Sequence, residues 1–340
     1  MRLVKKVKNM KNFVLYKGQE VLVFKDKVVM GDQVFDSSYY YYEMGGVLAR
    51  SDSDENLQIY KDGAFEDVKP RYGKLVLYYT PEIFSSSEET DGVMKFSFVE
   101  NGVEYIWEVE TDVTLFDTYS FGNSILIFNQ LDDKKLHFYT KTGERLWGYE
   151  EKEIVEVGGL FLSANEEIFE SKAMKIAKVF PVVDDVVVIV SHISTEGIYK
   201  AQGFKIRTGE KLWELRDNDC PDDLFLGEDK KLYGCYSYYD NLMLYCIDPF
   251  SGKMEGFAVK TNDEGINVCP WNVSMHNNCL FYGSNRPGCE LGVIDCGKRE
   301  LVEAIPLKFK KGCQVGAPIV SDGKVYVFSR GAGELRVYEL

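Results

Sequence analysis

Short runs in which apolar and polar residues alternate recur throughout this chain, and a period of two is typical of half-buried β-strands. Two of these runs, residues 136–139 and 203–206, are followed by nearly the same hexapeptide, residues 142–147 (TGERLW) and 208–213 (TGEKLW). A strand, a glycine turn and a second strand form a hairpin, because glycine adopts the positive φ of a tight turn without a steric clash. The two hexapeptides therefore predict β-hairpins.

Weaker copies of this turn recur at a regular spacing. The series of turn glycines is Gly18, Gly63, Gly102, Gly143, Gly209, Gly252 and Gly297, with intervals of 39 to 45 residues apart from one interval of 66. A period of about 40–45 residues with several short strands in each unit is typical of β-propeller blades.

The end of the chain predicts how the ring closes. Residues 324–328 and 334–338 repeat the second and third strands of a unit, but the chain ends at Leu340 before a fourth strand. We expect the N-terminal strands at residues 13–16 and 20–24 to complete this blade and remove its open edge. The sequence thus predicts an all-β fold, a seven-bladed β-propeller over residues 1–340, as one domain closed by its N-terminal strand.

The interval of 66 residues contains a helical pattern. Apolar residues at offsets of 0, 4, 7, 8 and 11 trace one helix face, and they are Phe169, Ala173, Ile176, Ala177 and Phe180. With Asn165 as its cap, this pattern predicts a short inserted helix near residues 166–179. The alternative is a first strand with an irregular loop.

The two hexapeptides resemble the turn of the pyrroloquinoline-quinone-type repeat, which is found in quinoprotein dehydrogenases and in related propellers that have lost the cofactor. In that family the tryptophan of the motif docks between neighbouring blades. The resemblance therefore implies docking roles for Trp147 and Trp213, and for Trp107 near the turn at Gly102. The close match covers two blades, and the chain lacks the adjacent cysteine pair that many of the dehydrogenases carry.

Charge and composition narrow the classes of partner. The chain has 40 Lys+Arg against 54 Asp+Glu, a net charge of −14, which repels nucleic acid and favours a basic protein partner. No apolar run approaches the roughly 20 residues that cross a bilayer, and no signal-peptide core is present. We therefore expect a cytoplasmic, monomeric protein that does not contact a membrane. All eight cysteines lie within residues 220–313 without metal-ligand spacing, which indicates small buried side chains in strands.

Catalytic patterns are missing from the sequence. The three histidines, His137, His192 and His276, fall in different units, and no nucleophile or metalloprotease motif is present. The acidic clusters at residues 52–55 and 217–223 lack the spacing of a calcium-binding loop. We therefore predict no metal, no cofactor and no enzymatic activity. A propeller hydrolase or lyase with a central pocket is the alternative.

The connections between the second and third strands of the blades, here called the b–c connections, provide the candidate binding face. Nine carboxylates on three successive blades form a predicted acidic crescent, made of Asp52, Asp54, Glu55, Glu82, Glu88, Glu89, Asp91, Asp132 and Asp133. Arg286 and Arg330 lie on later blades, and Tyr236, Tyr238 and Tyr239 form an aromatic cluster. Solvated loops and packing between blades explain the same residues without binding.

These observations predict an interaction module that presents its b–c connections to a protein partner. One alternative is an immunity protein, in which the acidic crescent steers a basic bacterial toxin.

Overall fold

The computed structural model describes most of the chain. The described residues are 1–44, 47–53, 57–68, 74–80, 83–90, 93–100, 103–110, 115–121, 125–130, 135–140, 142–161, 166–181, 185–193, 198–216, 224–238, 241–259, 268, 272–284, 290–309 and 313–340. Every extended element among them is a β-strand, and none of these residues belongs to a helix long and apolar enough to cross a membrane.

The first half of the chain forms four sheets, each with four antiparallel strands in chain order. The first contains β2 (Met10–Tyr16), β3 (Gln19–Phe24), β4 (Val28–Met30) and β5 (Gln33–Phe35). The second contains β6 (Tyr40–Met44), β7 (Val47–Ser51), β8 (Leu57–Lys61) and β9 (Ala64–Asp67). The third contains β10 (Lys74–Thr80), β11 (Ile83–Thr90), β12 (Val93–Glu100) and β13 (Val103–Glu110). The fourth contains β14 (Leu115–Phe121), β15 (Ile125–Gln130), β16 (Lys135–Thr140) and β17 (Arg145–Glu150).

A two-stranded hairpin, β18 (Ile154–Phe161) and β19 (Glu166–Ala173), separates these sheets from the second half. Two more chain-order sheets follow with β20 (Lys175–Pro181), β21 (Val186–Ile193), β22 (Ile198–Lys205) and β23 (Lys211–Arg216), and with β24 (Phe225–Leu226), β25 (Leu232–Tyr238), β26 (Asn241–Ile247) and β27 (Met254–Val259). The next contains β28 (Val273–His276), β29 (Cys279–Gly283), β30 (Glu290–Asp295) and β31 (Glu300–Pro306).

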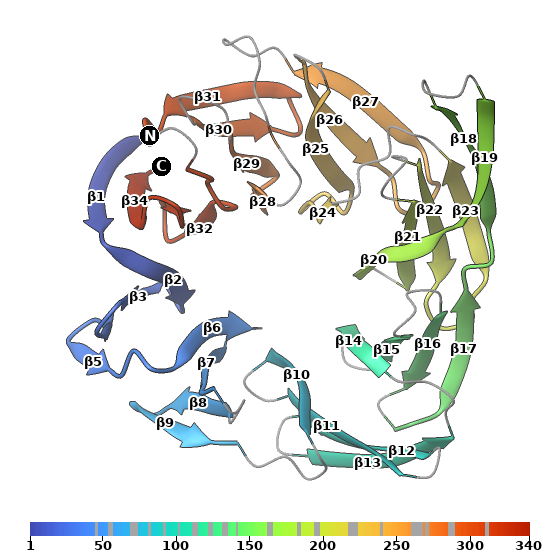
Figure 1. Ribbon diagram of the computed structural model, residues 1–340, viewed down its shortest axis with the longest axis horizontal. Coiled ribbons are helices and arrows are strands. Elements are labelled where there is room, and N and C mark those ends of the chain that lie inside the picture. The colour runs from blue at the N-terminus through green and yellow to red at the C-terminus, as the bar shows by residue number, and fades with distance from the viewer. Residues whose placement is uncertain are drawn as a thin grey trace.

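The last sheet joins the two ends of the chain. Its strands are β32 (Ile319–Ser321), β33 (Lys324–Ser329), β34 (Glu334–Glu339) and β1 (Arg2–Lys8), and we call it the closing sheet. β1 pairs antiparallel with β34 from Arg2↔Glu339 to Lys8↔Glu334. Figure 1 shows the sheets arranged as a ring around a central opening, with the two termini close together. The predicted all-β propeller and its closure by an N-terminal strand are confirmed.

The number of sheets differs from the expectation. The described strands form eight four-stranded sheets, where the glycine series predicts seven blades. Residues 13–16 and 20–24 do not complete the closing sheet but belong to β2 and β3 of a sheet of their own. The fourth strand of that sheet follows a turn at Gly31, which has φ 56° and falls outside the glycine series.

The predicted helix near residues 166–179 is wrong. β19 pairs with β18 from Ile154↔Ala173 to Phe161↔Glu166, and β20 begins at Lys175 as the innermost strand of the next sheet. Ile176 is buried in an apolar cluster with Leu136, Phe138 and Val187. The helical spacing therefore arises from two successive strands, and pairing of β19 with β18 and of β20 with β21 stabilises the extended backbone.

The core lies between adjacent sheets rather than at one centre. At the junction of the β14–β17 and β20–β23 sheets, Phe138 and Ile189 are fully buried against Phe204. At the next junction, Val188 and Leu232 are buried with Trp213. All five described cysteines are free, and Cys235 and Cys296 are buried in the core between the β24–β27 and β28–β31 sheets. Each sheet therefore depends on its neighbours for its core.

Trp147 and Trp213 each contact the following sheet, as the resemblance implies. The indole Nε1 of Trp147 donates to the carbonyl of Ile206 at 2.7 Å, and that of Trp213 donates to the carbonyl of Pro249 at 2.7 Å. Trp147 also stacks on Phe138 with ring centroids 3.8 Å apart. The side chain of Trp107 lies outside the described side chains.

Each indole rests on a turn glycine of the following sheet. A Cβ atom added to Gly209 would lie 2.6 Å from the ring of Trp147, and one added to Gly252 would lie 2.6 Å from the ring of Trp213. The two turn glycines also share a positive φ, of 70° and 71°, which disfavours a side chain at either position. Indole and glycine turn therefore form one packing unit at each junction.

We expect Gly209→Ala and Gly252→Ala to destabilise the fold more than Gly323→Ala does. Gly323 has a similar φ of 68° but no atom within 4 Å of an added Cβ, so it isolates the backbone strain. The strain costs about 1–2 kcal/mol in all three variants, and the clash with an indole adds roughly 1–3 kcal/mol in two of them. Thermal unfolding midpoints measure the difference, and equal midpoints for the three variants would contradict the packing unit.

The closing strand generates a second prediction. Deletion of residues 1–8 removes β1 and leaves the edge of β34 unpaired, so we expect a lower unfolding midpoint and association between copies. Size-exclusion chromatography with light scattering measures the association. Arg2→Ala is the control, because the Arg2–Glu339 pair is exposed and contributes little. A monomeric deletion variant with the wild-type midpoint would show that β1 is dispensable.

Candidate functional site

The b–c connections emerge on one side of the ring, because successive strands of each sheet run in opposite directions. By strand order they are residues 25–27, 52–56, 91–92, 131–134, 194–197, 239–240, 284–289 and 330–333. The connections between sheets, such as Asn9 between β1 and β2, lie on this side as well. The turns between first and second strands, and between third and fourth strands, lie on the other side.

Part of the predicted acidic crescent falls within the described residues. Asp52 directly follows β7 and is partly exposed. Glu88 and Glu89 lie in β11, where they pair with Lys95 and Met94 of β12, so they belong to a strand and not to a b–c connection. The other six carboxylates of the crescent lie outside the described residues, and they are Asp54, Glu55, Glu82, Asp91, Asp132 and Asp133.

The remaining predicted binding residues lie on the second half of the ring. Tyr236 and Tyr238 lie two residues apart in β25. Tyr239 and Arg286 lie outside the described residues. Arg330 is exposed in the b–c connection of the closing sheet.

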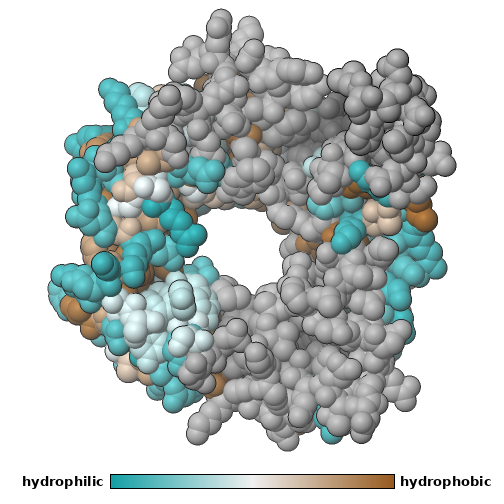
Figure 2. Space-filling view, viewed as in Figure 1, coloured by the Kyte–Doolittle hydropathy of each residue, from teal (hydrophilic) through white to brown (hydrophobic). Residues whose placement is uncertain are grey.

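Arg330 belongs to a cationic surface that sequence reasoning missed. Five exposed cations lie where the closing sheet meets the first sheet, and we call them the basic arc: Lys8, Lys11, Lys25, Lys27 and Arg330. Figure 2 shows hydrophilic residues over the part of the ring that β1 to β5 form.

Backbone contacts bring the members of the basic arc together. The amide of Met10 donates to the carbonyl of Gly333 at 3.0 Å, which joins the β1–β2 connection to the b–c connection that contains Arg330. Met10 of β2 pairs with Phe24 of β3, so Lys11 and Lys25 each lie next to one residue of this pair. Pairing of β2 with β3 brings Lys25 near Lys11. Arg330 joins these lysines only when the ring closes, so the sequence alone gives no signal for the complete arc.

The arc is not neutralised within the described part of the chain. Lys6 pairs with Glu334 at 2.9 Å and Lys5 with Glu20 at 2.5 Å, but the described residues give the five cations of the arc no ion pair. Asp26 is the one carboxylate in residues 8–11, 25–27 and 330–333. The arc therefore presents excess positive charge in a chain whose net charge is −14.

A pocket opens at the centre of the ring. Its volume is about 530 Å³, and the innermost strands β2, β6 and β32 of three successive sheets line it. Lys17, Glu43 and Ser321 supply polar groups at the side of the ring opposite the b–c connections. Its described lining contains no histidine or cysteine, and the three histidines lie on β16, β21 and β28 of different sheets.

A buried ionic network joins the β14–β17 sheet to the β20–β23 sheet on the b–c side. Lys200 is 5% exposed, and its Nζ lies 2.6 Å from the carboxylate of Glu151 and 3.0 Å from that of Glu153. The hydroxyl of Tyr149 donates to Glu151 at 2.7 Å. These contacts hold the start of the segment that leads into the β18–β19 hairpin.

The ion pairs shift the pKa values of the network's carboxyls. Burial on its own would raise the pKa of Glu151, but the hydrogen bonds from Lys200 and Tyr149 outweigh burial and hold this pKa below its usual value. The hydrogen bond from Arg216 lowers the pKa of Glu214 to about 2, with further hydrogen bonds from Lys211 and Gln202. Both carboxyls are therefore charged at neutral pH and serve a structural role.

Proteins similar to this chain are found among solved structures. No protein-family model matches the chain, and no curated protein sequence matches it. BamB from Moraxella catarrhalis is similar with a TM-score of 0.56 and 13% identity, over 99% of this chain and 97% of that chain. Sqt1 from Saccharomyces cerevisiae has a TM-score of 0.54 and 10% identity, over 100% of this chain and 99% of that chain.

A third solved structure is the β-propeller domain of Cps50 (Swd1) from Myceliophteria thermophila. Its TM-score is 0.50 at 10% identity, over 100% of this chain and 99% of that chain. At such low identities, these similarities establish the β-propeller fold over the length of the chain and nothing finer.

The low pKa of Glu214 predicts how acid acts on the fold. A carboxyl with a lowered pKa stabilises the folded state fully above its usual pKa, and the stabilisation is lost as pH falls toward the lowered value. Glu214→Gln should therefore weaken the dependence of stability on pH between about 4.5 and about 2. Urea unfolding across this range measures the slope.

Glu210→Gln is the matched control, because Glu210 makes an exposed ion pair with Lys205 on the same sheet. We expect that variant to follow the wild-type profile. Identical profiles for Glu214→Gln and the wild type would show that the network does not contribute to acid unfolding.

Proposed function

We propose that this chain is a non-enzymatic, cofactor-free β-propeller that binds a protein partner through the face with the b–c connections. The observation that carries the proposal is the basic arc, five exposed cations without an ion pair in the described part of the chain. Uncompensated charge adds little to folding stability, whereas it orients and attracts an oppositely charged partner. The pyrroloquinoline-quinone-type repeat is part of the same proposal and rests on Trp147 and Trp213.

The chemistry of the arc favours an acidic segment of a protein. Lys25, Lys27 and Arg330 belong to the b–c connections of the two sheets that meet at a single junction. A short run of Asp or Glu residues can bind all three cations together. Nucleic acid fits less well, because the net charge of −14 repels a long phosphate backbone. The partner is therefore recognised locally, on a small cationic surface of an acidic protein.

The ring suits this role mechanically. The b–c connections extend from sheets that pack on both neighbours, so their ends are held at fixed positions around the opening. A rigid scaffold lowers the entropy that binding costs, because little of the surface has to be ordered on contact. Proteins of this kind present variable connections on an invariant frame.

Paired charge reversals test the proposal. The wild type, Lys25→Glu with Lys27→Glu, and the control Lys61→Glu with Lys324→Glu serve as baits in a pull-down from the native cell, followed by mass spectrometry. Lys61 and Lys324 are exposed lysines beside turns on the other side of the ring. For a partner retained by the wild type, we expect association at low salt to slow about tenfold or more with the arc variant and to stay unchanged with the control.

A second arm addresses a basic partner. Glu88→Lys with Glu89→Lys reverses charge on the acidic crescent, on which an inhibitor of a basic toxin would depend. Loss of binding in this variant alone, with the arc variant unaffected, would overturn the acidic-segment proposal in favour of the inhibitor. Turnover of a small molecule by the purified chain would overturn the non-enzymatic assignment.

A further inference from the structure

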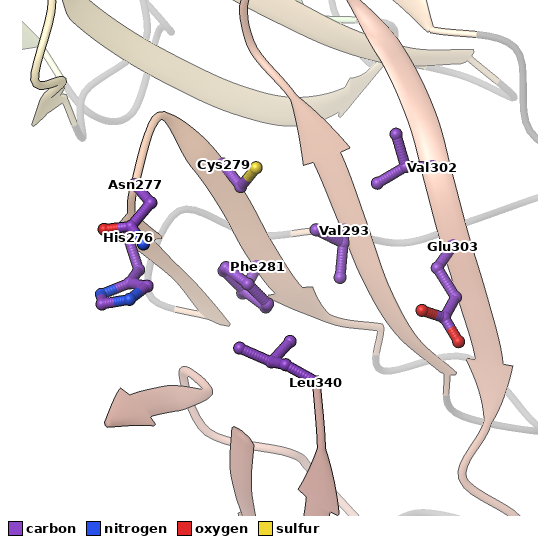
Figure 3. Close-up of a pocket in the computed structure, with 8 residues that line it drawn as sticks. All are labelled: His276, Asn277, Cys279, Phe281, Val293, Val302, Glu303 and Leu340. Carbon is purple, nitrogen blue, oxygen red and sulfur yellow. The ribbon is translucent and has the colours of Figure 1, made fainter. Parts of the chain in front are cut away.

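A pocket lies where the β28–β31 sheet meets the closing sheet, away from the b–c face. Its volume is about 300 Å³. Figure 3 shows its lining, with Phe281 and Val293 from β29 and β30, Val302 and Glu303 from β31, and Leu340 beyond β34. Phe281 and Val293 are 3% and 6% exposed and form a buried apolar wall, whereas Val302 and Leu340 are 47% and 54% exposed. His276, Asn277 and Cys279 complete the lining.

The pairing of the strands shows which position of the other sheets Glu303 corresponds to. Glu303 pairs with Val293, and a bulge at Val302 precedes this pair. Trp213 pairs with Gly203 across a bulge at Leu212, and Trp147 pairs with Phe138 across a bulge at Leu146. Glu303 therefore occupies the position in its sheet that the two tryptophans occupy in theirs.

The hydrogen-bond acceptor of the indoles also has a counterpart here. Ile206, which accepts from Trp147, follows β22, and its amide donates to the residue before β21, Asp185, at 2.8 Å. Leu340 follows β34, and its amide donates to the residue before β33, Gly323, at 2.9 Å. Leu340 therefore stands where Ile206 stands, and its backbone oxygen is the counterpart acceptor.

Glu303 does not fill the space of an indole. Its carboxylate accepts a hydrogen bond from the backbone nitrogen of Met1 in the closing sheet. The apolar side chains of Phe281, Val293 and Leu340 lie together in Figure 3 without an aromatic ring from β31 between them. The junction thus keeps an apolar wall and an acceptor position that two other junctions use to hold an indole.

We propose that this pocket binds a small planar aromatic molecule of the size and polarity of indole, with one N–H donor. The ring packs on Phe281 and Val293, and the N–H donates to a backbone oxygen of Leu340. Apolar cavities of about 150 Å³ hold benzene, so a pocket of this size has room for a bicyclic ring. This site is independent of the proposed protein-binding face, so either proposal can fail without the other.

Titration of the full chain with indole tests the site, with indene as the matched compound of the same shape that lacks the N–H. Ligand-observed NMR and isothermal titration calorimetry measure binding. We expect saturable binding of indole, about fivefold tighter than that of indene, because one hydrogen bond contributes about 1 kcal/mol. No saturable binding of indole, or equal affinity for both compounds, would overturn the proposal and leave the pocket as a packing gap.

Two variants locate the bound molecule. Glu303→Trp supplies an indole from the chain itself, so we expect it to abolish indole binding, whereas Glu303→Gln retains binding. Val302→Trp blocks the mouth from the neighbouring position, where Val302 is 47% exposed, and serves if Glu303→Trp does not fold. Indole binding that survives in the folded tryptophan variant would place the ligand elsewhere and overturn the assignment.

Discussion

One contact position holds the ring together, and the rest of the structure depends on it. It is a fourth-strand residue, and we call it the docking position. In five sheets it pairs with the third-strand residue two positions before the end of that strand, and these residues are Lys5, Phe35, Trp147, Trp213 and Glu303. In the β24–β27 sheet it is Glu255, which pairs with Cys246 one position before the end of β26. Each of these six residues contacts the following sheet.

The residue at the docking position and the residue that it contacts in the following sheet change together from one junction to another. Trp147 and Trp213 meet turn glycines, whereas Glu255 meets Arg299, which replaces the glycine in the turn and binds the carboxylate at 3.0 Å. The guanidinium of Arg299 also lies 3.7 Å from the ring centroid of Phe257, so it fills the space of an indole. Lys5 binds Glu20 at 2.5 Å, and Phe35 packs edge-on against Phe65. An indole at the docking position packs on a turn glycine, whereas a carboxylate at this position binds a cation. Either contact joins the two neighbouring sheets.

This pairing explains what the sequence could predict and what it could not. The hexapeptides mark Trp147 and Trp213 because an indole with a glycine turn has a recognisable spacing, and the alternating strands predict the all-β class. Lys5, Glu255 and Glu303 are ordinary charged residues whose docking role depends on strand register, which a single sequence does not state. The glycine series misassigns the first sheet for a related reason. Its glycine in the series, Gly18, lies in the turn between β2 and β3, whereas Gly31, in the turn between its third and fourth strands, is only 32 residues before Gly63. In the basic arc, the position of Arg330 beside the lysines depends on ring closure, which has no local signal in the sequence.

The docking position constrains one side of the ring, because it lies near the turns between third and fourth strands. On the other side, the described contacts between sheets include the hydrogen bond from the amide of Met10 to the carbonyl of Gly333, and the buried pair of Glu151 and Lys200 at the junction after β17. That junction also carries the inserted β18–β19 hairpin, whose base the pair holds. A buried charge without its partner is strongly destabilising, so this pair fixes the path of the chain where the insertion begins.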